Sequence, residues 1–177
     1  MSQRTLFLTT VLAVTALSAA VAMAEPKAWT ASSDRFGPLK FGMSYSEAFR
    51  ALRSETGDGA QAAPDAPSVS CLELPVPSQI DAVMMFENDR LTRVTFYGDS
   101  PVLTTLGIGL GATESEVMAK YPTALASKRL NVAAPAADLT YWLKFNITGI
   151  RFKTNDKREV DTVLVGAQSI TYAGGCA

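Results

Sequence analysis

The side chains that could do chemistry in this chain are few, because its 177 residues include no histidine and only two cysteines. The absence of histidine excludes Ser-His-Asp and Cys-His catalysis, and it removes the commonest protein ligand of zinc. A hydrolase that uses two carboxylates is the remote alternative that stays open. Acidic residues cluster at Asp156, Glu159 and Asp161, but their spacing does not match a calcium-binding loop. We therefore expect no catalytic residue, no metal and no cofactor.

Basic and aromatic side chains point to binding rather than catalysis. They alternate with apolar residues over 90–97, 139–146 and 149–154. Successive side chains of a strand point to opposite faces, so one face of a sheet would collect them. These residues are Arg93, Tyr97, Trp142, Lys144, Arg151 and Lys153. Because Trp, Tyr and Arg most often dominate protein interfaces, we predict that this outer face binds a protein with acidic groups.

Two other interpretations of these strands stay open. In the first, Trp142 is covered by a helix or by an Ala/Pro-rich loop, and the basic residues are ordinary solvated ones. In the second, the sheet and helices enclose an apolar pocket lined by Met84, Phe86 and Phe152. The protein would then be a carrier of a small apolar ligand in the cell envelope.

The helices that must position these strands begin with a motif that occurs twice, FGMSYSEAF at 41–49 and LGATESEVM at 110–118. Each copy has a hydroxyl residue followed three positions later by glutamate, which is typical of a capping box at a helix N-terminus. The two pairs are Ser44 with Glu47 and Thr113 with Glu116. We predict helices over 45–54 and 114–120, and capping is a sufficient role for these two glutamates.

An Ala/Pro-rich stretch follows each helix, and we expect both stretches, 57–68 and 131–138, to be loops. Alternating segments after each loop predict strands. In the first half they are 69–76, 80–87, 90–97 and 101–108, and in the second half 139–146, 149–154, 159–165 and 168–173. Residues 29–36 are a candidate edge strand.

The order of these elements predicts an α+β fold of two tandem repeats. Each repeat is a capped helix followed by a three- to four-stranded antiparallel sheet, because connections this short do not allow parallel crossovers. The first repeat spans 25–105 and the second 106–177. Units of this size bury little surface alone, so we expect the two halves to pack together.

Residues 1–24 have the features of a signal peptide. Arg4 supplies a positive start, residues 6–21 are mainly apolar, and Ala22-Met23-Ala24 is a cleavage site of the small-x-small kind. An uncleaved membrane anchor is the alternative, for which the stretch is short. We expect a soluble protein exported to the periplasm or the medium, without stable membrane insertion after cleavage. The net charge of −1 argues against nucleic acid as a partner.

Cys71 and Cys176 are an even number of cysteines in a chain expected to be exported. This favours a disulfide over two buried free thiols, and it leaves no thiolate nucleophile. The bridge would close a loop of about 100 residues and stabilise the fold by up to roughly 4–5 kcal/mol in the chain-entropy account. It would tie the first half of the chain to the C-terminus.

The Gly-Met-Ser-x-x-Glu motif at 42–47, followed by a Pro-bearing loop and antiparallel strands, resembles the SmpA/OmlA type of small envelope proteins. Two such units after a signal peptide resemble the secreted β-lactamase-inhibitory proteins, and residues 149–177 are similar to a group of short uncharacterised secreted bacterial proteins. The resemblance implies a non-enzymatic fold that presents a sheet face to another protein. The chain has no lipid-anchor cysteine and its disulfide would link the halves, so β-lactamase inhibition is not carried over. We predict an exported protein-binding or inhibitory module whose partner is an exported or envelope protein.

Overall fold

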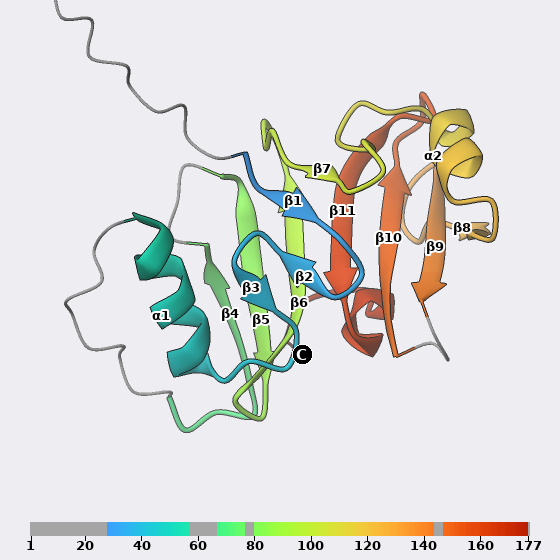
Figure 1. Cartoon of the computed structure of the whole chain (residues 1–177). Coiled ribbons are helices and arrows are strands. Elements are labelled where there is room, and N and C mark those ends of the chain that lie inside the picture. Colours follow the sequence, from blue (N-terminus) through green and yellow to red (C-terminus); the bar gives the residue numbers. More distant parts are fainter. Residues whose placement is uncertain (1–27, 57–66, 77–79, 144–146, 177) are drawn as a thin grey trace, which may run out of the picture.

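The computed structural model describes residues 28–56, 67–76, 80–143 and 147–176. Within these ranges the fold is α+β, built mainly of strands with two α-helices (Figure 1). The predicted signal peptide and most of the first Ala/Pro-rich loop lie outside the described residues. None of the helices in the described ranges is long and apolar enough to cross a membrane.

Seven strands form one large sheet in which every neighbouring pair is antiparallel. In spatial order they are β4 (Cys71–Pro75), β5 (Ala82–Glu87), β6 (Arg90–Tyr97), β11 (Val160–Gly166), β10 (Thr148–Thr154), β9 (Ala137–Leu143) and β8 (Leu125–Lys128). The two halves of the chain therefore meet at the pairing of β6 with β11, where Val94 lies opposite Val165. The meander β4–β5–β6 comes from the first half, and β9–β10–β11 comes from the second.

A small second sheet has the order β3 (Leu39–Lys40), β2 (Arg35–Phe36), β1 (Thr30–Ala31) and β7 (Leu103–Thr104). The predicted edge strand at 29–36 is thus a short hairpin. The predicted strand at 101–108 shrinks to two residues, which pair in parallel with β1 and not with the large sheet. The expectation that every pair would be antiparallel is wrong at this one place, because β7 returns to the small sheet after the long excursion through α1 and β4–β6.

The two helices begin where the repeated motif predicts. Helix α1 (Tyr45–Thr56) runs two residues beyond the expected end, and α2 (Glu114–Lys120) has the expected bounds. At α1 the Ser44 N–H donates to the Glu47 carboxylate at 2.8 Å, and the Glu47 N–H donates back to Ser44 Oγ at 3.3 Å. Thr113 and Glu116 repeat this exchange at 2.7 and 3.3 Å. Both capping boxes are confirmed.

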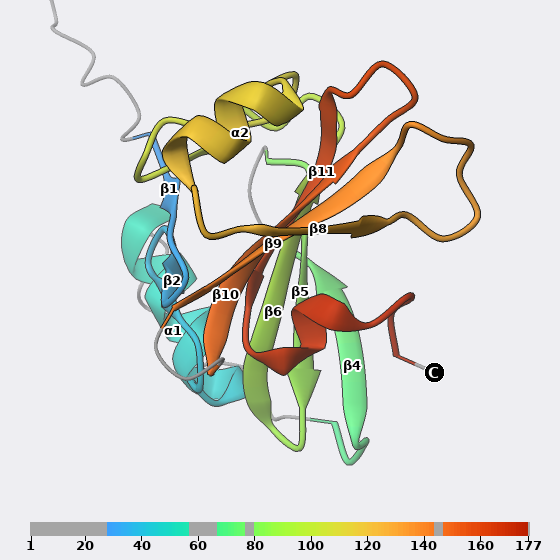
Figure 2. The ribbon, with the colours of Figure 1, turned by 90° about the vertical axis from the view of Figure 1, so that its right-hand side faces the viewer.

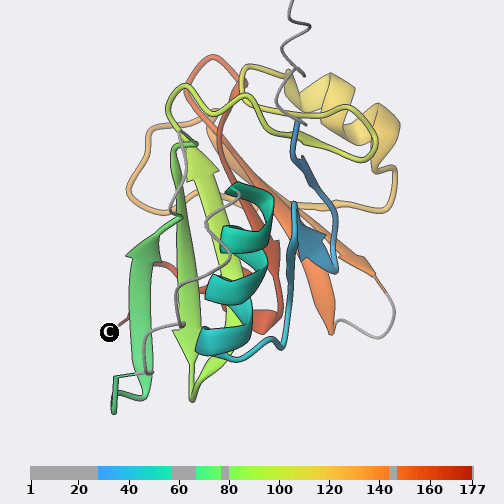
Figure 3. The same cartoon turned by 60° about the vertical axis from the view of Figure 1, so that its left-hand side comes forward.

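The core lies between one face of the large sheet and a layer made of α1, the small sheet and α2. Figure 3 shows α1 in front of β4–β6 with the small sheet beside it. Fully buried side chains from all these elements form one cluster, including Phe36, Leu52, Phe96, Val117 and Phe152. We call the face of the large sheet that packs against this core its inner face, and the opposite face its outer face.

The C-terminal segment crosses the outer face. Figure 2 shows α1 and the small sheet on one side of the large sheet, and η1 (Gln168–Thr171) with the chain end on the other. The predicted strand at 168–173 is therefore wrong. β11 already has β6 and β10 on its two edges, so the segment that follows it cannot pair beside β11 as a further strand. The predicted disulfide is confirmed: Cys176 is bonded to Cys71 at the start of β4.

Candidate functional site

The predicted interface residues are distributed unequally over the outer face. Arg151 and Lys153 lie on β10 and are half-buried, and Trp142 on β9 is half-buried as well. Tyr97, at the end of β6, is 43% exposed. Lys144 lies outside the described residues. Arg93 on β6 is only 4% exposed, so its side chain is not part of the accessible surface.

Arg93 is buried because the C-terminal segment lies over it. Its guanidinium donates to the carbonyl oxygens of Ser169 and Gly174 at 3.0 and 3.1 Å, and to the Glu73 carboxylate at 2.7 Å. Glu73 lies on β4, with Met85 of β5 between it and Arg93 in the sheet. Arg93 therefore fixes the C-terminal segment on β4–β6, and this part of the outer face is closed to a partner.

Trp142 is partly covered from the same side. It lies opposite Gly149, which in turn lies opposite Gly166 on β11. A Cβ atom at Gly149 would lie 2.8 Å from Trp142 Cε3 and 3.1 Å from Ile170 Cδ1 of η1. Gly149 makes room for η1, whose Ile170 is fully buried over the sheet beside the indole. Trp142 is therefore held in place by η1 while remaining partly accessible.

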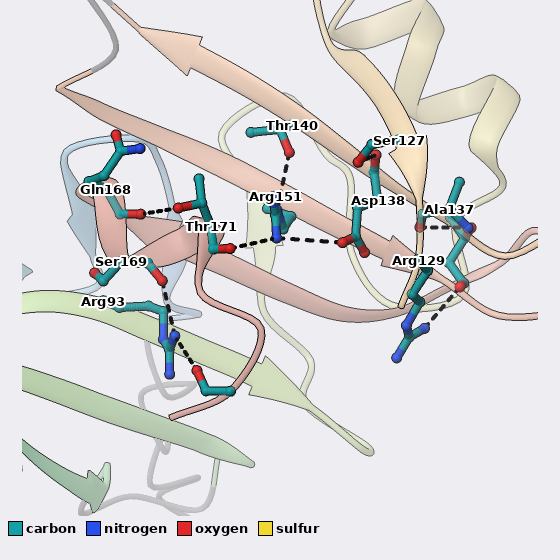
Figure 4. Close-up of polar contacts among 12 residues, drawn as sticks. Arg93, Ser127, Arg129, Ala137, Asp138, Thr140, Arg151, Gln168, Ser169 and Thr171 are labelled. Atoms are coloured by element: carbon teal, nitrogen blue, oxygen red, sulfur yellow. Dashed lines mark hydrogen bonds and ion pairs between the residues drawn. The ribbon is translucent and has the colours of Figure 1, made fainter. Parts of the chain in front are cut away.

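Arg151 forms the link between the sheet and the C-terminal segment. Figure 4 shows its guanidinium between Thr140, Asp138 and Thr171. Nε donates to Thr140 Oγ1 at 3.1 Å, and Nη1 donates to the Thr171 carbonyl oxygen at 3.3 Å. The same Nη1 lies 3.5 Å from Asp138 Oδ2, and both side chains of this ion pair are largely buried. Such a fixed guanidinium is pre-organised for a ligand that approaches from solvent.

A recess of about 390 Å³ opens on the outer face between residues 127–132, the strands β9 and β10, and the C-terminal segment. We call it the basic recess. Its charged and polar lining residues include Lys128, Arg129, Asp138, Arg151, Lys153 and Thr171. Arg129 is held at its wall, since Nη1 donates to the Thr154 carbonyl oxygen at 2.9 Å and contacts the Asp161 carboxylate at 2.5 Å. Four cations thus face two carboxylates.

Lys153 is the most unusual charge in the basic recess. It lies directly opposite Asp138 in the pairing of β10 with β9. Burial lowers the pKa of its ammonium; the nearby Asp138 opposes this shift, whereas Arg129 and Arg151 add to it. Within the described part of the chain, this ammonium makes no hydrogen bond and no ion pair. A half-buried cation without an acceptor is costly unless something else supplies one.

The sequence prediction missed three members of the recess, Lys128, Arg129 and Asp138. Residues 125–128 form β8, although this segment has neither β-branched nor aromatic residues to indicate a strand. Asp138 falls in the stretch predicted to be a loop, whereas β9 begins one residue before it. The only available signal was the Lys128-Arg129 pair itself, which resembles an ordinary solvated surface.

The other residues that the sequence offers for catalysis or ligand binding lie outside the basic recess. Glu47 and Glu116 cap their helices, and the described residues contain no group of three or more His, Cys, Asp or Glu side chains able to share a metal ion. Met84, Phe86 and Phe152 are buried in the core. The rings of Tyr45 and Phe86 have centroids 5.4 Å apart, and those of Tyr121 and Phe152 are 5.1 Å apart. These three side chains therefore fill the core.

Comparison of the chain with protein-family models, with characterised proteins and with solved structures finds no match. The basic recess and the two aromatic side chains beside it, Trp142 and Tyr97, are therefore the features that point to a function.

Proposed function

We propose that the protein is an exported, non-enzymatic binding or inhibitory module, and that it uses the uncovered part of its outer face to bind another exported or envelope protein. This part comprises the basic recess, Trp142 on one flank and Tyr97 on the other. Tyr97 belongs to it because it lies opposite Thr162, which lies opposite Lys153. The partner contributes acidic groups.

The concentration of positive charge in the basic recess carries this proposal. The whole chain has a net charge of −1, yet among the described residues four cations and the carboxylate of Asp138 line the recess, and Asp161 pairs with Arg129 at its wall. Aromatic rings beside a pre-organised guanidinium are the composition that dominates measured interface energies. Complementary charge would speed association with an acidic partner and select against basic ones.

The architecture agrees with this role. We propose that the two halves are copies of one unit, since each contributes a capped helix followed by a three-stranded meander. This is the arrangement expected from the resemblance to SmpA/OmlA-type and β-lactamase-inhibitory proteins. The disulfide between β4 and the C-terminus supports export, because disulfides persist in oxidising compartments.

The carrier of a small apolar ligand is the weaker candidate. It requires an empty space around Met84, Phe86 and Phe152, and these side chains are at most 3% exposed and belong to one packed core cluster. A carboxylate-dependent hydrolase is weaker still, because Glu47 and Glu116 are occupied by their helix caps.

Affinity capture from cell-envelope and culture extracts, with chain 25–177 as bait, tests the proposal. Wild type is compared with Trp142→Ala, Tyr97→Ala and the double variant. The matched control is Leu106→Ala, which removes a large exposed apolar side chain outside the recess. We expect one protein with an acidic surface to be enriched by wild type and by the control, and to be lost with the double variant.

The thermal midpoint of each variant is measured in parallel, so that loss of binding is separated from loss of fold. Equal capture by wild type and by a folded double variant contradicts the use of this face. Enrichment of the same protein by a folded variant whose recess cations have been replaced by neutral residues would contradict the electrostatic part of the proposal.

A further inference from the structure

Lys153 and Asp138 are the side chains from which a more specific inference starts. Asp138 is only 8% exposed, and its Oδ1 is buried without a hydrogen-bond partner. Its Oδ2 faces Arg151 at 3.5 Å, which is long for an ion pair. The carboxylate thus makes one long ion pair with Arg151 and lies opposite Lys153 in the strand pairing without an ion pair to it, so it saturates neither cation.

Arg129 approaches the same space from the opposite wall. Its contacts with Thr154 and Asp161 both use Nη1. Nε and Nη2 make no hydrogen bond within the described residues. The basic recess therefore combines an ammonium with no acceptor and a guanidinium with unused donors, and Lys128 adds a further charge at the rim.

The class of ligand follows from these unused donors. Several N–H groups on fixed cations, facing a space of a few hundred Å³, suit a group that offers two or three negatively charged oxygens. A neutral ligand would leave the excess charge uncompensated. A cation would face four like charges.

We propose that the basic recess is an oxyanion-binding site that takes a carboxylate or a phosphate, with Lys153 and Arg129 as its principal donors and Arg151 held beside Lys153 by Asp138. This inference rests on the proposed function, because it names the group that an acidic partner would insert. Trp142 and Tyr97 would then contact the surface around that group.

The test uses the intact chain 25–177 and two probes at low ionic strength, inorganic phosphate and an acetylated, amidated triglutamate peptide, with triglutamine as the neutral control. Backbone amide NMR shifts are followed for residues 127–132, 138 and 151–153. We expect saturable shifts at these positions with phosphate, with triglutamate, or with both. The pattern identifies which source of oxyanion the site prefers.

Two substitutions remove one donor each without adding a negative charge, Lys153→Gln and Arg129→Gln. Since a charge-assisted hydrogen bond contributes about 1.5–3 kcal/mol, we expect each to weaken binding about tenfold or more. Lys157→Gln, at an exposed turn outside the recess, changes the net charge equally and is expected to weaken binding less than about twofold. Lys153→Arg keeps the charge and should retain most of the affinity.

Three results would overturn the inference: no saturable shift with either probe, equal weakening by Lys157→Gln, or shifts that triglutamine also produces. If Lys153→Gln does not fold, the pKa of the Lys153 ammonium in the wild-type protein, measured with and without the probe, still decides. An oxyanion bound at Lys153 must raise this pKa. Capture of a partner that survives a folded Lys153→Gln variant and fails with Trp142→Ala would sustain the proposed function and reject the oxyanion site. Oxyanion binding without any captured partner would do the reverse.

Discussion

The guanidinium of Arg93 lies 2.7 Å from the carboxylate of Glu73, and the two side chains meet beneath the C-terminal segment. The pair spans the strand β5, with Arg93 on β6 and Glu73 on the edge strand β4. Because Arg93 also donates to the carbonyl oxygens of Ser169 and Gly174, one side chain connects three parts of the chain. Arg93, which the sequence predicts to be an interface residue, therefore stabilises the fold instead.

Removal of Arg93 should destabilise the protein strongly. Arg93→Ala leaves the Glu73 carboxylate and two carbonyl groups without their donor, and breaking a largely buried ion pair costs about 3–5 kcal/mol. Because Glu73 is one-third exposed, we expect about 2–3 kcal/mol, measured as a lower urea midpoint at an unchanged m-value. Arg93→Lys should recover only part of this, since an ammonium lacks the planar fork.

The control for Arg93 is Arg158→Ala. Arg158 lies 3.7 Å from Glu114, but its side chain is 62% exposed, so we expect a change within about 0.5 kcal/mol. If Arg93→Ala were as mild as this control, the C-terminal segment would not depend on the guanidinium.

The disulfide should stabilise the same segment from its other end. The double variant Cys71→Ser, Cys176→Ser is expected to lose about 2–5 kcal/mol, and reduced and alkylated wild type should behave alike. Arg93 and the disulfide both hold residues 172–176. In a double-mutant cycle, the combined variant should therefore lose less free energy of unfolding than the sum of the two separate losses. Additive losses would mean that the two anchors act on separate parts of the molecule.

The local elements of this fold could be predicted from the sequence because their signals are local. Strand β6 has the predicted bounds, and the turn at Asn88-Asp89 has the positive φ angles, 49° and 59°, that suit these residues in a tight hairpin. The capping boxes predict where both helices begin. The joining of the two halves into one sheet depends on the contact of β6 with β11, whose paired residues lie 65 to 73 positions apart in the sequence and carry no joint signal.

Alternation assigns a side chain to a face but cannot tell what covers that face. This is why Arg151 and Lys153 were predicted correctly as outer-face residues, and why Arg93 was wrongly expected to be accessible. The segment 168–173 alternates like a strand, and yet it lies across the sheet as η1, because both edges of β11, the strand that it follows, are already paired with β6 and β10. Arg129 belongs to the candidate site only through the position of β8, which has a weak sequence signal.

Gly166 should tolerate no side chain. Its φ is +146°, and an added Cβ atom would collide with the carbonyl oxygen of Thr92 on the neighbouring strand. We expect Gly166→Ala to cost more than about 2 kcal/mol, because both strain and a backbone clash must be relieved. Urea unfolding and proteolysis at the C-terminal segment measure the loss.

Gly174→Ala is the matched control for this position, since an added Cβ atom there meets no atom within 4 Å. Its stability should stay within about 0.5 kcal/mol of wild type. An equal loss in the two variants would contradict the specific clash of a Gly166 side chain with the Thr92 carbonyl oxygen on β6.

The capping boxes should make stability depend on pH in the acid range. Hydrogen bonds from the Ser44 and Thr113 backbone N–H groups lower the pKa of Glu47 and Glu116 below 4.5 in the folded chain. A folded-state pKa below the unfolded value gives a stabilisation that is present above pH 4.5 and is lost as the pH falls through the folded pKa.

The double variant Glu47→Gln, Glu116→Gln keeps a capping acceptor and cannot titrate there, so its stability should fall less steeply than that of wild type. For the double variant Ser44→Ala, Thr113→Ala, the steepness of this fall should lie between that of wild type and that of the glutamine variant, because the hydroxyls contribute the smaller part of each pKa shift. Free energies of unfolding from urea titrations at a series of acid pH values test this order, and identical acid slopes in all three proteins would refute it.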